Sequence, residues 1–300
     1  LYDGETDELF NGIFSRVSEV EQKMSVNRAD SEVSSINALA GKSPFVVSEE
    51  TYGVIEKGKS YGELTSGRFD IAIGPLVKLW GIGTDAAKVP EPDAVRECLS
   101  HIDFHKIILD PEAHSVFLAE AGMALDLGGI AKGWAAEKSA RYLREQGVQH
   151  AILDFGGNIY AYGTKPDGSA WRIGVQNPSE PRGKYIGIIE AKDKAVVTSG
   201  KYERFFMEGG KRYHHILDIQ SGFPVENGVA SVTIVTSDST DADALSTSVF
   251  TLGVKEGLAF AESRPEIEAI IIDEENKVYL THGIESAFKL TDPAFMITGD

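Results

Sequence analysis

The sequence predicts an α+β fold, in which a mixed and largely antiparallel sheet forms the core and helices flank it. Two observations carry this prediction. Apolar residues at helical spacing mark long helices near the N-terminus and after residue 239, whereas most of residues 149–236 reads as consecutive short strands bounded by turn residues. Consecutive strands without intervening helices favour antiparallel pairing over a doubly wound parallel sheet. The 300 residues could form one large domain or two small ones, and no internal repeat or long linker interrupts them.

The N-terminal part is predicted to be mainly helical. Residues 7–24 carry apolar side chains at a 3.6-residue period, and a second helix is expected from Ser48 to near Gly67. Residues 24–37 are rich in Ser, Asn and Asp, so we expect a loop with helix caps there. Residues 67–81 are apolar and punctuated by glycines, which we interpret as a strand and turn beside a ligand.

The rest of the chain is predicted to be mostly strands with three further long helical segments. Residues 84–97 contain two prolines and are expected to be an exposed connection into a short helix. The other predicted helices are residues 130–146, 240–252 and 255–263. The predicted strands are residues 106–109, 115–119, 123–126, 149–155, 159–162, 171–175, 185–190, 195–198, 204–207, 213–217, 229–236, 269–273 and 277–281.

Composition and charge exclude several classes of protein. With 42% hydrophobic and 25% charged residues, the composition is that of a soluble globular protein. The net charge of −17 argues against nucleic acid or an anionic membrane as a general partner, because both repel such a surface. The single cysteine, Cys98, excludes an internal disulfide and any multi-cysteine metal site. No stretch approaches the roughly 20 apolar residues of a membrane span.

The most informative stretch is residues 124–133, A-L-D-L-G-G-I-A-K-G. An apolar run ends at Asp126, two glycines follow, and a helix is expected to begin with Lys132 in its first turn. Such a joint exposes backbone N–H groups at the positive end of a helix and lets a ligand approach closely. It is a candidate phosphate or metal-phosphate site, and the alternative is an ordinary tight turn. Its spacing is neither that of a P-loop nor that of the dinucleotide-binding fingerprint.

The second stretch is residues 241–248, D-A-D-A-L-S-T-S. If this segment is helical, Asp243 and Thr247 lie four residues apart on one face, so that a carboxylate and a hydroxyl converge. Oxygen ligands of this kind suit Mg²⁺. The alternative is a helix N-terminus with acidic and hydroxyl side chains as caps, and Asp241 is expected to be such a cap.

The third stretch is residues 213–224, Y-H-H-I-L-D-I-Q-S-G-F-P. His214 and His215 are adjacent, so on a strand they face opposite sides and only one can enter a site. A histidine can accept the proton of a hydroxyl near neutral pH, which makes His215 a candidate base. The alternative is a structural histidine.

Eight sequence blocks occur in the order in which the ApbE family carries its motifs, and the chain closely resembles that family up to about Gly253. The blocks are M-S at Met24, S-E-V-S-S-I-N, G-R-F-D-I-A-I-G-P-L-V-K-L-W-G, L-D-L-G-G-I-A-K-G-W-A, D-F-G-G-N-I at Asp154, V-V-T-S-G-K-Y-E-R at Val196, H-H-I-L-D at His214 and A-D-A-L-S-T-S-V-F-T-L-G at Ala242. The resemblance implies an ApbE-like fold in a single domain over residues 1–300, and a Mg²⁺-dependent flavin transferase. Such an enzyme cleaves the pyrophosphate of FAD, attaches FMN to a threonine or serine hydroxyl of an acceptor protein and releases AMP.

The resemblance also implies roles for individual residues. The metal ligands would be the side chains of Asp243 and Thr247 and the backbone carbonyl of Gly129, and His215 would be the base that activates the acceptor hydroxyl. The residues expected to contact FAD are Arg68, Phe69, Asp70, Asp126, Lys132 and Ile216.

One position departs from the family pattern. Many transferases of the family have a tyrosine three residues beyond the motif methionine, whereas this chain has Asn27. An amide offers no stacking face to a ring, so we expect FAD to be held less firmly and water to be admitted more readily. This favours an additional hydrolysis of FAD to FMN and AMP.

One alternative to the transferase function stays open, and the resemblance also implies where in the cell the protein is located. The alternative is a protein that binds FAD without turnover. Self-modification is disfavoured because the chain contains no S/T-G-A-S/T acceptor pattern. Family members are commonly exported and held at the membrane by an N-terminal lipid. We therefore expect an extracytoplasmic protein whose anchor segment precedes Leu1.

Overall fold

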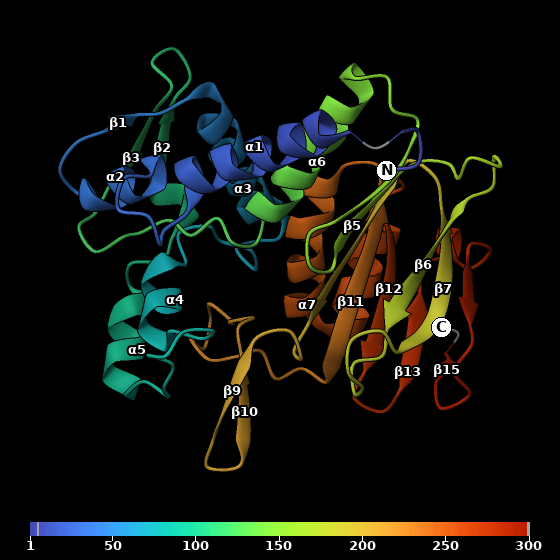
Figure 1. The fold of residues 1–300 in the computed structure, drawn as a ribbon. Helices are drawn as coiled ribbons and strands as arrows, with labels where there is room; N and C mark the ends of the chain where they lie inside the picture. The colour runs from blue at the N-terminus through green and yellow to red at the C-terminus, as the bar shows by residue number, and fades with distance from the viewer. Residues whose placement is uncertain (5, 299–300) are drawn as a thin grey trace. The chain divides into compact units, whose positions relative to one another are not determined.

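The computed structural model describes residues 1–4 and 6–298, which form two compact units (Figure 1). The sheet unit consists of the described residues of Leu1–Val17, Lys132–Tyr202 and Glu226–Asp300, and the helical unit consists of Ser18–Ala131 and Glu203–Val225. The predicted first helix is confirmed as α1 (Asp7–Met24), and the division between the units falls within it. The prediction of a single domain over residues 1–300 stays a prediction.

The sheet unit is built on seven hydrogen-bonded strands. Their order across the sheet is β15 (Met296–Ile297), β13 (Lys277–Leu280), β12 (Glu268–Asp273), β11 (Val229–Thr236), β8 (Lys194–Gly200), β5 (Asn158–Gly163) and β4 (His150–Asp154). Every neighbouring pair is antiparallel except β13 and β15. The α+β prediction with a largely antiparallel sheet is therefore confirmed.

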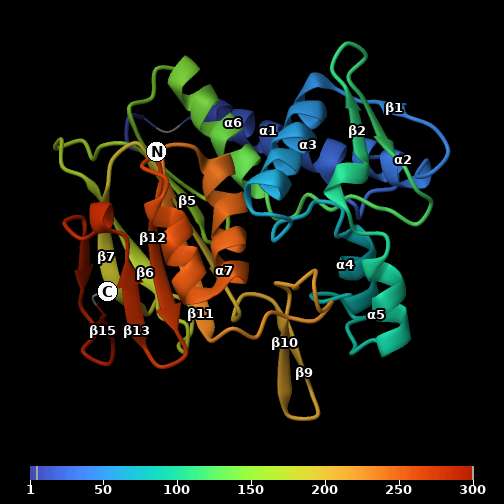
Figure 2. The same ribbon diagram turned by 180° about the vertical axis from the view of Figure 1, so that it is seen from behind.

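Different layers cover the two faces of this sheet. On one face lies a second antiparallel sheet of β14 (Phe288–Leu290), β7 (Tyr185–Ala191) and β6 (Trp171–Gln176). Apolar side chains from both sheets, among them Trp171, Val196 and Val235, form the buried core between them. On the other face lies α7 (Ser239–Glu262), which Figure 2 shows running along β11 and β12. A 3-10 turn, η2 (His282–Ile284), follows β13.

Two helices of the sheet unit matter for the site. Helix α6 (Ala131–Glu145) confirms the helix expected after the paired glycines. The two helices predicted at residues 240–252 and 255–263 are one element, α7, interrupted by a kink at Gly253. That glycine has φ 83° and ψ 179°, a conformation that a side chain would strain. The interruption predicted between the two helices is therefore present, but it is a kink and not a loop.

The helical unit contains four short or medium helices and a small sheet. The helices are α2 (Glu32–Ala38), α3 (Glu49–Leu64), α4 (Gly74–Trp80) and α5 (Pro92–Leu99), with a 3-10 turn η1 (Phe104–Lys106). The sheet has the order β1 (Phe45–Val46), β3 (Ser115–Leu118), β2 (Ile107–Asp110) and is antiparallel. Helix α3 begins where the sequence predicted, because the Ser48 side chain accepts the backbone N–H of Thr51 as an N-cap.

A two-stranded hairpin completes the helical unit (Figure 1). Strands β9 (Phe205–Glu208) and β10 (Lys211–His214) are antiparallel and joined by Gly209 and Gly210. Both glycines have positive φ, 58° and 80°, as the tight two-residue turn of a hairpin requires.

Two expectations for the helical unit are wrong. Residues 24–37, predicted to be a loop, include α2, which begins where the Ser31 hydroxyl accepts the N–H of Ser34. The same Ser and Asn residues that suggested a loop act as a cap and as part of the helix. Residues 67–81, predicted to be a strand and turn, contain α4 instead. Pro75 occupies the start of this helix and Gly81 ends it in a left-handed conformation, so these residues bound a helix rather than a strand.

Two strand predictions are also corrected. Residues 123–126 do not form a strand; Ala124 makes one isolated bridge with Ile73. The side-chain amide of Asn37 holds this segment by bonding both backbone groups of Leu125. The strand predicted at residues 213–217 ends at His214. The short strands β1, β14 and β15 were not predicted, because two or three residues are too few to show a periodic pattern.

Candidate functional site

Asp243 is held at a junction of α6 and α7 in the sheet unit. It lies in the second turn of α7 with only 3% of its surface exposed. Its Oδ1 atom is 2.7 Å from the Nζ atom of Lys132, and its Oδ2 atom accepts the backbone N–H of Gly133 at 2.9 Å. The two candidates Lys132 and Asp243, 111 residues apart, are therefore in direct contact. A buried carboxylate with both oxygens occupied is fixed in position.

Three further residues fix the start of α7. Asp238 is the N-cap, since its Oδ1 atom accepts the N–H groups of Thr240 and Asp241 at 2.7 and 3.1 Å. The expectation that Asp241 is a cap is therefore wrong; it belongs to the first helical turn. The N–H of Ser239 donates to Glu137 on α6 at 3.3 Å, and the Ser239 hydroxyl donates to the side-chain oxygen of Asn158 at 2.8 Å.

Gly133 allows the two helices to approach this closely. A Cβ atom at this position would lie 2.2 Å from the carbonyl oxygen of Ser239 and 2.8 Å from the Cβ atom of Asp243. Neither distance is compatible with a side chain, and the nearer atom belongs to the backbone, which cannot move aside cheaply. The glycine is thus required by the packing that brings the Gly133 N–H to Asp243.

Thr247 is one turn beyond Asp243 on α7 and is half-buried. Its hydroxyl oxygen is 3.3 Å from the hydroxyl oxygen of Ser199 on β8, which also lies 2.8 Å from the hydroxyl of Ser246. The predicted helical spacing of Asp243 and Thr247 is confirmed, which places a carboxylate and a hydroxyl on one face of α7.

The donors around Asp243 fit a hard divalent cation. Carboxylate and hydroxyl oxygens are what Mg²⁺ prefers, and the Lys132 ammonium shows that a positive charge is already accommodated at Oδ1. Among the described residues there is no group of three or more His, Cys, Asp and Glu side chains that could hold a metal ion. A set of one carboxylate, one hydroxyl and one backbone carbonyl would not form such a group.

In the helical unit, Asp126 shapes the paired-glycine turn. Its Oδ1 atom accepts the N–H of Gly128 at 2.7 Å, and its own N–H donates to the carbonyl of Ile71. Burial raises the pKa of Asp126 above its usual value, opposed by the Gly128 hydrogen bond and by the charge of Arg204. Gly129 lies against Phe69, because a Cβ atom there would be 3.0 Å from the ring. Gly129 and Phe69, two candidates from separate motifs, are thus neighbours.

The remaining residues of the R-F-D motif differ in how their side chains are used. Arg68 is half-buried, and its guanidinium is 4.0 Å from the carboxylate of Asp218. The side chain of Asp70 is buried, and its two oxygens accept the N–H groups of Ala72 and Phe104 at 2.7 and 2.9 Å. Burial raises the pKa of Asp70 to about 6. The Asp70 carboxylate therefore holds the local backbone together.

The two adjacent histidines have different surroundings, although His215 is not on the strand that the sequence predicted. His214 is buried and its Nε2 atom is 3.0 Å from the carbonyl of Val225, so it belongs to the core. His215 is half-buried and lies just beyond the end of β10. Its backbone N–H donates to the carbonyl of Arg204, and its Nδ1 atom is 3.2 Å from the same oxygen. Ile216, which follows, is buried.

Asn27 lies in the turn after α1 and is exposed. Its backbone N–H donates to the hydroxyl of Ser25. The exposed amide is compatible with the expected contact with a ligand, and the role of Asn27 stays a prediction.

Sequence reasoning did not single out the residues that support these candidates. Ser199 and Arg204 lie within the block V-V-T-S-G-K-Y-E-R, and Asn158 lies within D-F-G-G-N-I. Alternation along β8 could have placed Ser199 on the same face as Val197. No signal in the sequence identifies which helix that face meets, so the contact with Thr247 required the structure.

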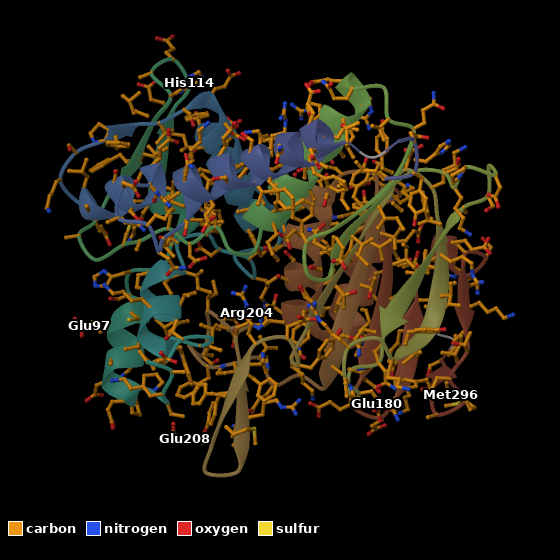
Figure 3. The ribbon with its side chains drawn as sticks, in the orientation of Figure 1. Glu97, His114, Glu180, Arg204, Glu208 and Met296 are labelled. Atoms are coloured by element: carbon orange, nitrogen blue, oxygen red, sulfur yellow. The ribbon has the colours of Figure 1, made fainter. Side chains whose placement is uncertain are left out.

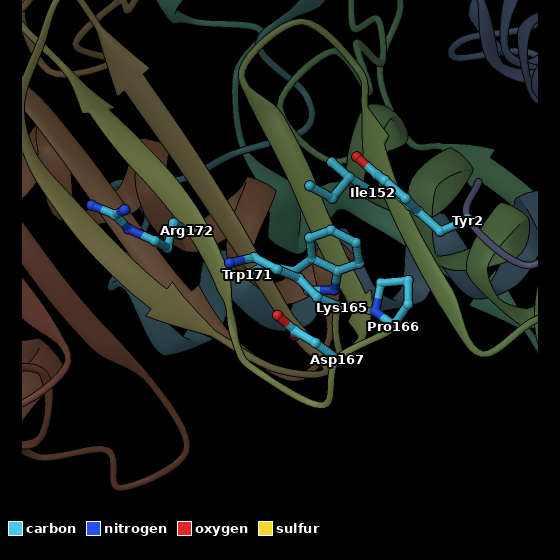
Figure 4. Close-up of a pocket in the computed structure, with 7 residues that line it drawn as sticks. All are labelled: Tyr2, Ile152, Lys165, Pro166, Asp167, Trp171 and Arg172. Carbon is cyan, nitrogen blue, oxygen red and sulfur yellow. The ribbon is translucent and has the colours of Figure 1, made fainter.

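A pocket elsewhere in the sheet unit contains none of the candidates (Figure 4). Its lining residues are Tyr2, Ile152, Lys165, Pro166, Asp167, Trp171 and Arg172. The ring of Trp171 lies under Tyr2, with 5.0 Å between the ring centroids, and its indole N–H donates to the carbonyl of Tyr162. The indole N–H of Trp171, the buried residue of this pocket, therefore already has a hydrogen-bond partner.

No helix in the described part of the chain has the length and apolar character needed to cross a bilayer.

Comparison with known proteins places this geometry in context. The model of the ApbE family matches residues 2–271. A Treponema pallidum protein named FAD:protein FMN transferase is 39% identical, over 95% of this chain and 82% of that protein. The crystal structure of the ApbE protein from Thermotoga maritima has a TM-score of 0.87 and 32% identity, covering 93% of this chain and 91% of that one. The flavin transferase ApbE from Vibrio cholerae has a TM-score of 0.85 and 31% identity, covering 95% and 91%.

Proposed function

The chain belongs to the ApbE family, and on this premise we propose that it is an FAD:protein FMN transferase that works with Mg²⁺. Relatives that carry this name match nearly the whole chain, at 38% and 39% identity for two of them. The observation that carries the proposal is the buried Asp243 carboxylate, joined to Lys132 at the start of α6. This arrangement offers fixed oxygen donors and a cation for an anionic substrate.

The proposed reaction exchanges one phosphorus–oxygen bond for another. The oxygen of an acceptor threonine or serine hydroxyl attacks the FMN phosphorus of FAD, and the bond from that phosphorus to the bridging pyrophosphate oxygen breaks. AMP leaves with the bridging oxygen, and the hydroxyl proton passes to His215. The protein's contribution is to position these groups and to offset their charge.

Asp243 and Thr247 would hold Mg²⁺ through their side chains. When bound, Mg²⁺ would neutralise charge on the pyrophosphate oxygens. Lys132 adds a second positive charge beside the same carboxylate, which an anionic ligand needs in a chain of net charge −17. Ser199 keeps the Thr247 hydroxyl oriented, since the two oxygens are 3.3 Å apart.

His215 is suited to accept a proton at one particular nitrogen. A backbone carbonyl only accepts hydrogen bonds, so the Nδ1 atom, 3.2 Å from the Arg204 oxygen, carries the hydrogen there. In the neutral ring the lone pair is then on Nε2, which is the atom that takes the acceptor proton. The Arg204 carbonyl therefore sets the tautomer of the proposed base.

The other candidates would bind the FAD molecule. Arg68, Phe69 and Ile216 are proposed to lie against the flavin nucleotide, and Phe69 also packs on Gly129. Asp126 and Asp70 are proposed to act chiefly by fixing the backbone of their turns, because their carboxylates accept backbone N–H groups at 2.7 to 2.9 Å. Both turns would then present backbone groups to the ligand.

A direct test uses mass spectrometry of a carrier protein with a C-terminal extension containing Ser-Gly-Ala-Thr. Incubated with this protein, FAD and Mg²⁺, the carrier should gain the mass of an FMN phosphoester, and AMP should appear in equal amount. If FAD copurifies intact and neither product forms, the alternative of a non-catalytic FAD-binding protein is favoured.

A second activity is proposed on the strength of Asn27. Its amide provides no aromatic face for a ring of FAD, so water can compete with the acceptor hydroxyl. We expect slow AMP release from FAD and Mg²⁺ alone, and the variant Asn27→Tyr should lower it relative to transfer. If no AMP appears over many enzyme equivalents, hydrolysis is excluded.

An extracytoplasmic location with an N-terminal anchor is proposed by family analogy alone, and fractionation of cells expressing the full-length gene would test it.

A further inference from the structure

The hairpin β9–β10 has one face that packs and one face that is largely exposed. On the inner face, Phe206 stacks on Tyr213 at 5.3 Å between centroids, and both rings pack against Trp80 at 6.4 and 5.7 Å. Because side chains alternate along a strand, Phe205 and Met207 point to the opposite side. The inner face explains why the hairpin is held in the helical unit. On the outer face the cross-strand partner of Phe205, His214, is buried, whereas Phe205, Met207 and Arg212 are exposed.

The outer face carries exposed apolar side chains and a cation. We define it by Phe205, Met207 and Arg212. Phe205 and Met207 are 41% and 56% exposed, and Arg212 is the cross-strand partner of Met207. The guanidinium carbon of Arg212 lies 4.4 Å from the ring centroid of Phe205, which leaves the edge of the guanidinium available to a carboxylate. Apolar side chains beside an exposed arginine are typical of a protein-binding surface.

The charge of the hairpin is opposite to that of the chain. Residues 204–212 contain Arg204, Lys211 and Arg212 but a single acidic residue, Glu208, whose carboxylate accepts the backbone N–H of Val89. Figure 3 shows Glu208 on this hairpin and Arg204 near its base. The chain as a whole carries −17, so it repels an acidic partner nearly everywhere else. The hairpin is a local exception.

The hairpin is also continuous with the proposed base. Arg204 immediately precedes β9, and His215 immediately follows β10. The Arg204 carbonyl accepts both the backbone N–H and the ring N–H of His215. A segment bound along the hairpin is thereby led to His215. The sheet has only two strands, so each strand has one side without a strand neighbour, where an extended segment can add.

The size of the hairpin favours a peptide over a second copy of the chain as the occupant. Strands of four residues are only about 13 Å long. A stable dimer needs about 800 Å² from each partner, so it would have to extend well beyond the three residues of this face. An extended peptide segment needs much less.

We propose that the outer face of β9–β10 docks an extended acidic segment of the acceptor protein, with an apolar side chain on Phe205 and Met207 and a carboxylate on Arg212. The segment then delivers its hydroxyl to His215. This inference rests on the proposed function, since it concerns the acceptor of that transfer.

The test is a charge-reversal experiment on FMN transfer. The probes are two carrier proteins whose C-terminal extensions contain Ser-Gly-Ala-Thr and differ only in flanking residues, which are Asp in one and Lys in the other. For the wild type, the acidic extension should have the lower KM. Arg212→Glu should raise the KM of the acidic extension roughly tenfold and lower that of the basic one, with the affinity for FAD unchanged.

Variants of the apolar residues complete the test. Phe205→Thr with Met207→Thr keeps the strand propensity and should raise the KM of both extensions. The control is Met296→Thr, another exposed methionine on a strand (60% exposed; Figure 3), which should change neither KM. Equal KM values for wild type and Arg212→Glu on both extensions, in an active enzyme, overturn the docking surface alone. Absence of any transfer by a wild type that binds FAD overturns the proposed function, and the docking surface with it.

Discussion

Asp243 and His215, the two residues on which the proposed reaction depends, are held in different ways. Asp243 is 3% exposed and is fixed by a side chain and a backbone group of a neighbouring helix. His215 is half-buried at the end of a hairpin, and the Nδ1 atom of its ring lies 3.2 Å from the backbone carbonyl oxygen of Arg204. The difference matches the two substrates. A small dinucleotide can enter a preformed polar site, whereas a protein hydroxyl can reach only a base near the surface.

The largest expected effect is on the Asp243 side of this comparison. Asp243→Ala should lower the rate of FMN transfer by about 10³-fold and abolish its dependence on Mg²⁺, because a fixed charge-stabilising group is lost. The rate of AMP release, measured at increasing Mg²⁺ concentrations, tests both effects. Asp243→Asn keeps an acceptor for Gly133 and guards against misfolding. The control Asp241→Ala, in the first turn of the same helix, should behave as wild type. Normal turnover in Asp243→Ala would contradict the role proposed for Asp243.

His215→Ala should slow FMN transfer by roughly 10²-fold while leaving FAD affinity unchanged, because only proton transfer is lost. Fluorescence titration of FAD and the initial rate of acceptor labelling separate the two quantities. His105→Ala, an exposed histidine in η1, is the matched control. Weakened FAD binding together with an unchanged maximal rate would show that His215 is a binding residue, and the distinction between the two regions would disappear.

The pH dependence of stability tests whether the side chain of Asp70 is buried in the folded protein. Its pKa is raised from 3.8 to about 6 by burial. As pH rises through this interval the unfolded chain releases the proton first, so stability falls, by about 3 kcal/mol in total. The free energy of unfolding of the wild type minus that of Asp70→Asn should therefore decrease between about pH 4 and about pH 7. Parallel curves for the two proteins would mean that Asp70 is not held in this way.

The smallest expected effect concerns the packing that fixes Asp243. Gly133→Ala should destabilise the protein by about 2 kcal/mol, because the new methyl group would meet the Ser239 carbonyl at 2.2 Å. Urea denaturation measures the loss. Gly53→Ala on α3 is the control, since a Cβ atom there meets nothing within 4 Å; it should stabilise by roughly 0.5 to 1 kcal/mol. Equal effects of the two substitutions would contradict the close helix contact.

The fold was predictable where periodicity runs over many residues. Helices α1 and α6 and strand β11 agree with the sequence to within one residue, because each has a long apolar pattern and clear end signals. Prediction failed where the same residue pattern is compatible with two different local structures. Ser31 could cap a helix or make a turn, and the apolar residues before Gly81 could form a strand or a short helix. Tertiary packing decides such cases.

One geometric feature of the candidate site was predictable from the sequence, whereas the residues that support the candidates were not. Spacing alone suggested that Asp243 and Thr247 share a helix face, which the structure confirms. The contact of Lys132 with Asp243 joins residues 111 positions apart, and no local pattern indicates it. The roles of Gly133 and Ser199 depend equally on tertiary proximity, so they appear only in the structure.

One measurement tests the central claim most directly, which is that FMN transfer from FAD to a protein hydroxyl needs both the fixed Asp243 and the half-buried His215. The carrier with the Ser-Gly-Ala-Thr extension is incubated with FAD and Mg²⁺ and either the wild type, Asp243→Ala or His215→Ala, and the intact carrier is weighed by mass spectrometry. We predict an FMN phosphoester on the threonine or serine with the wild type and almost none with either variant. An unmodified carrier with the wild type, or equal labelling by all three proteins, would contradict the account.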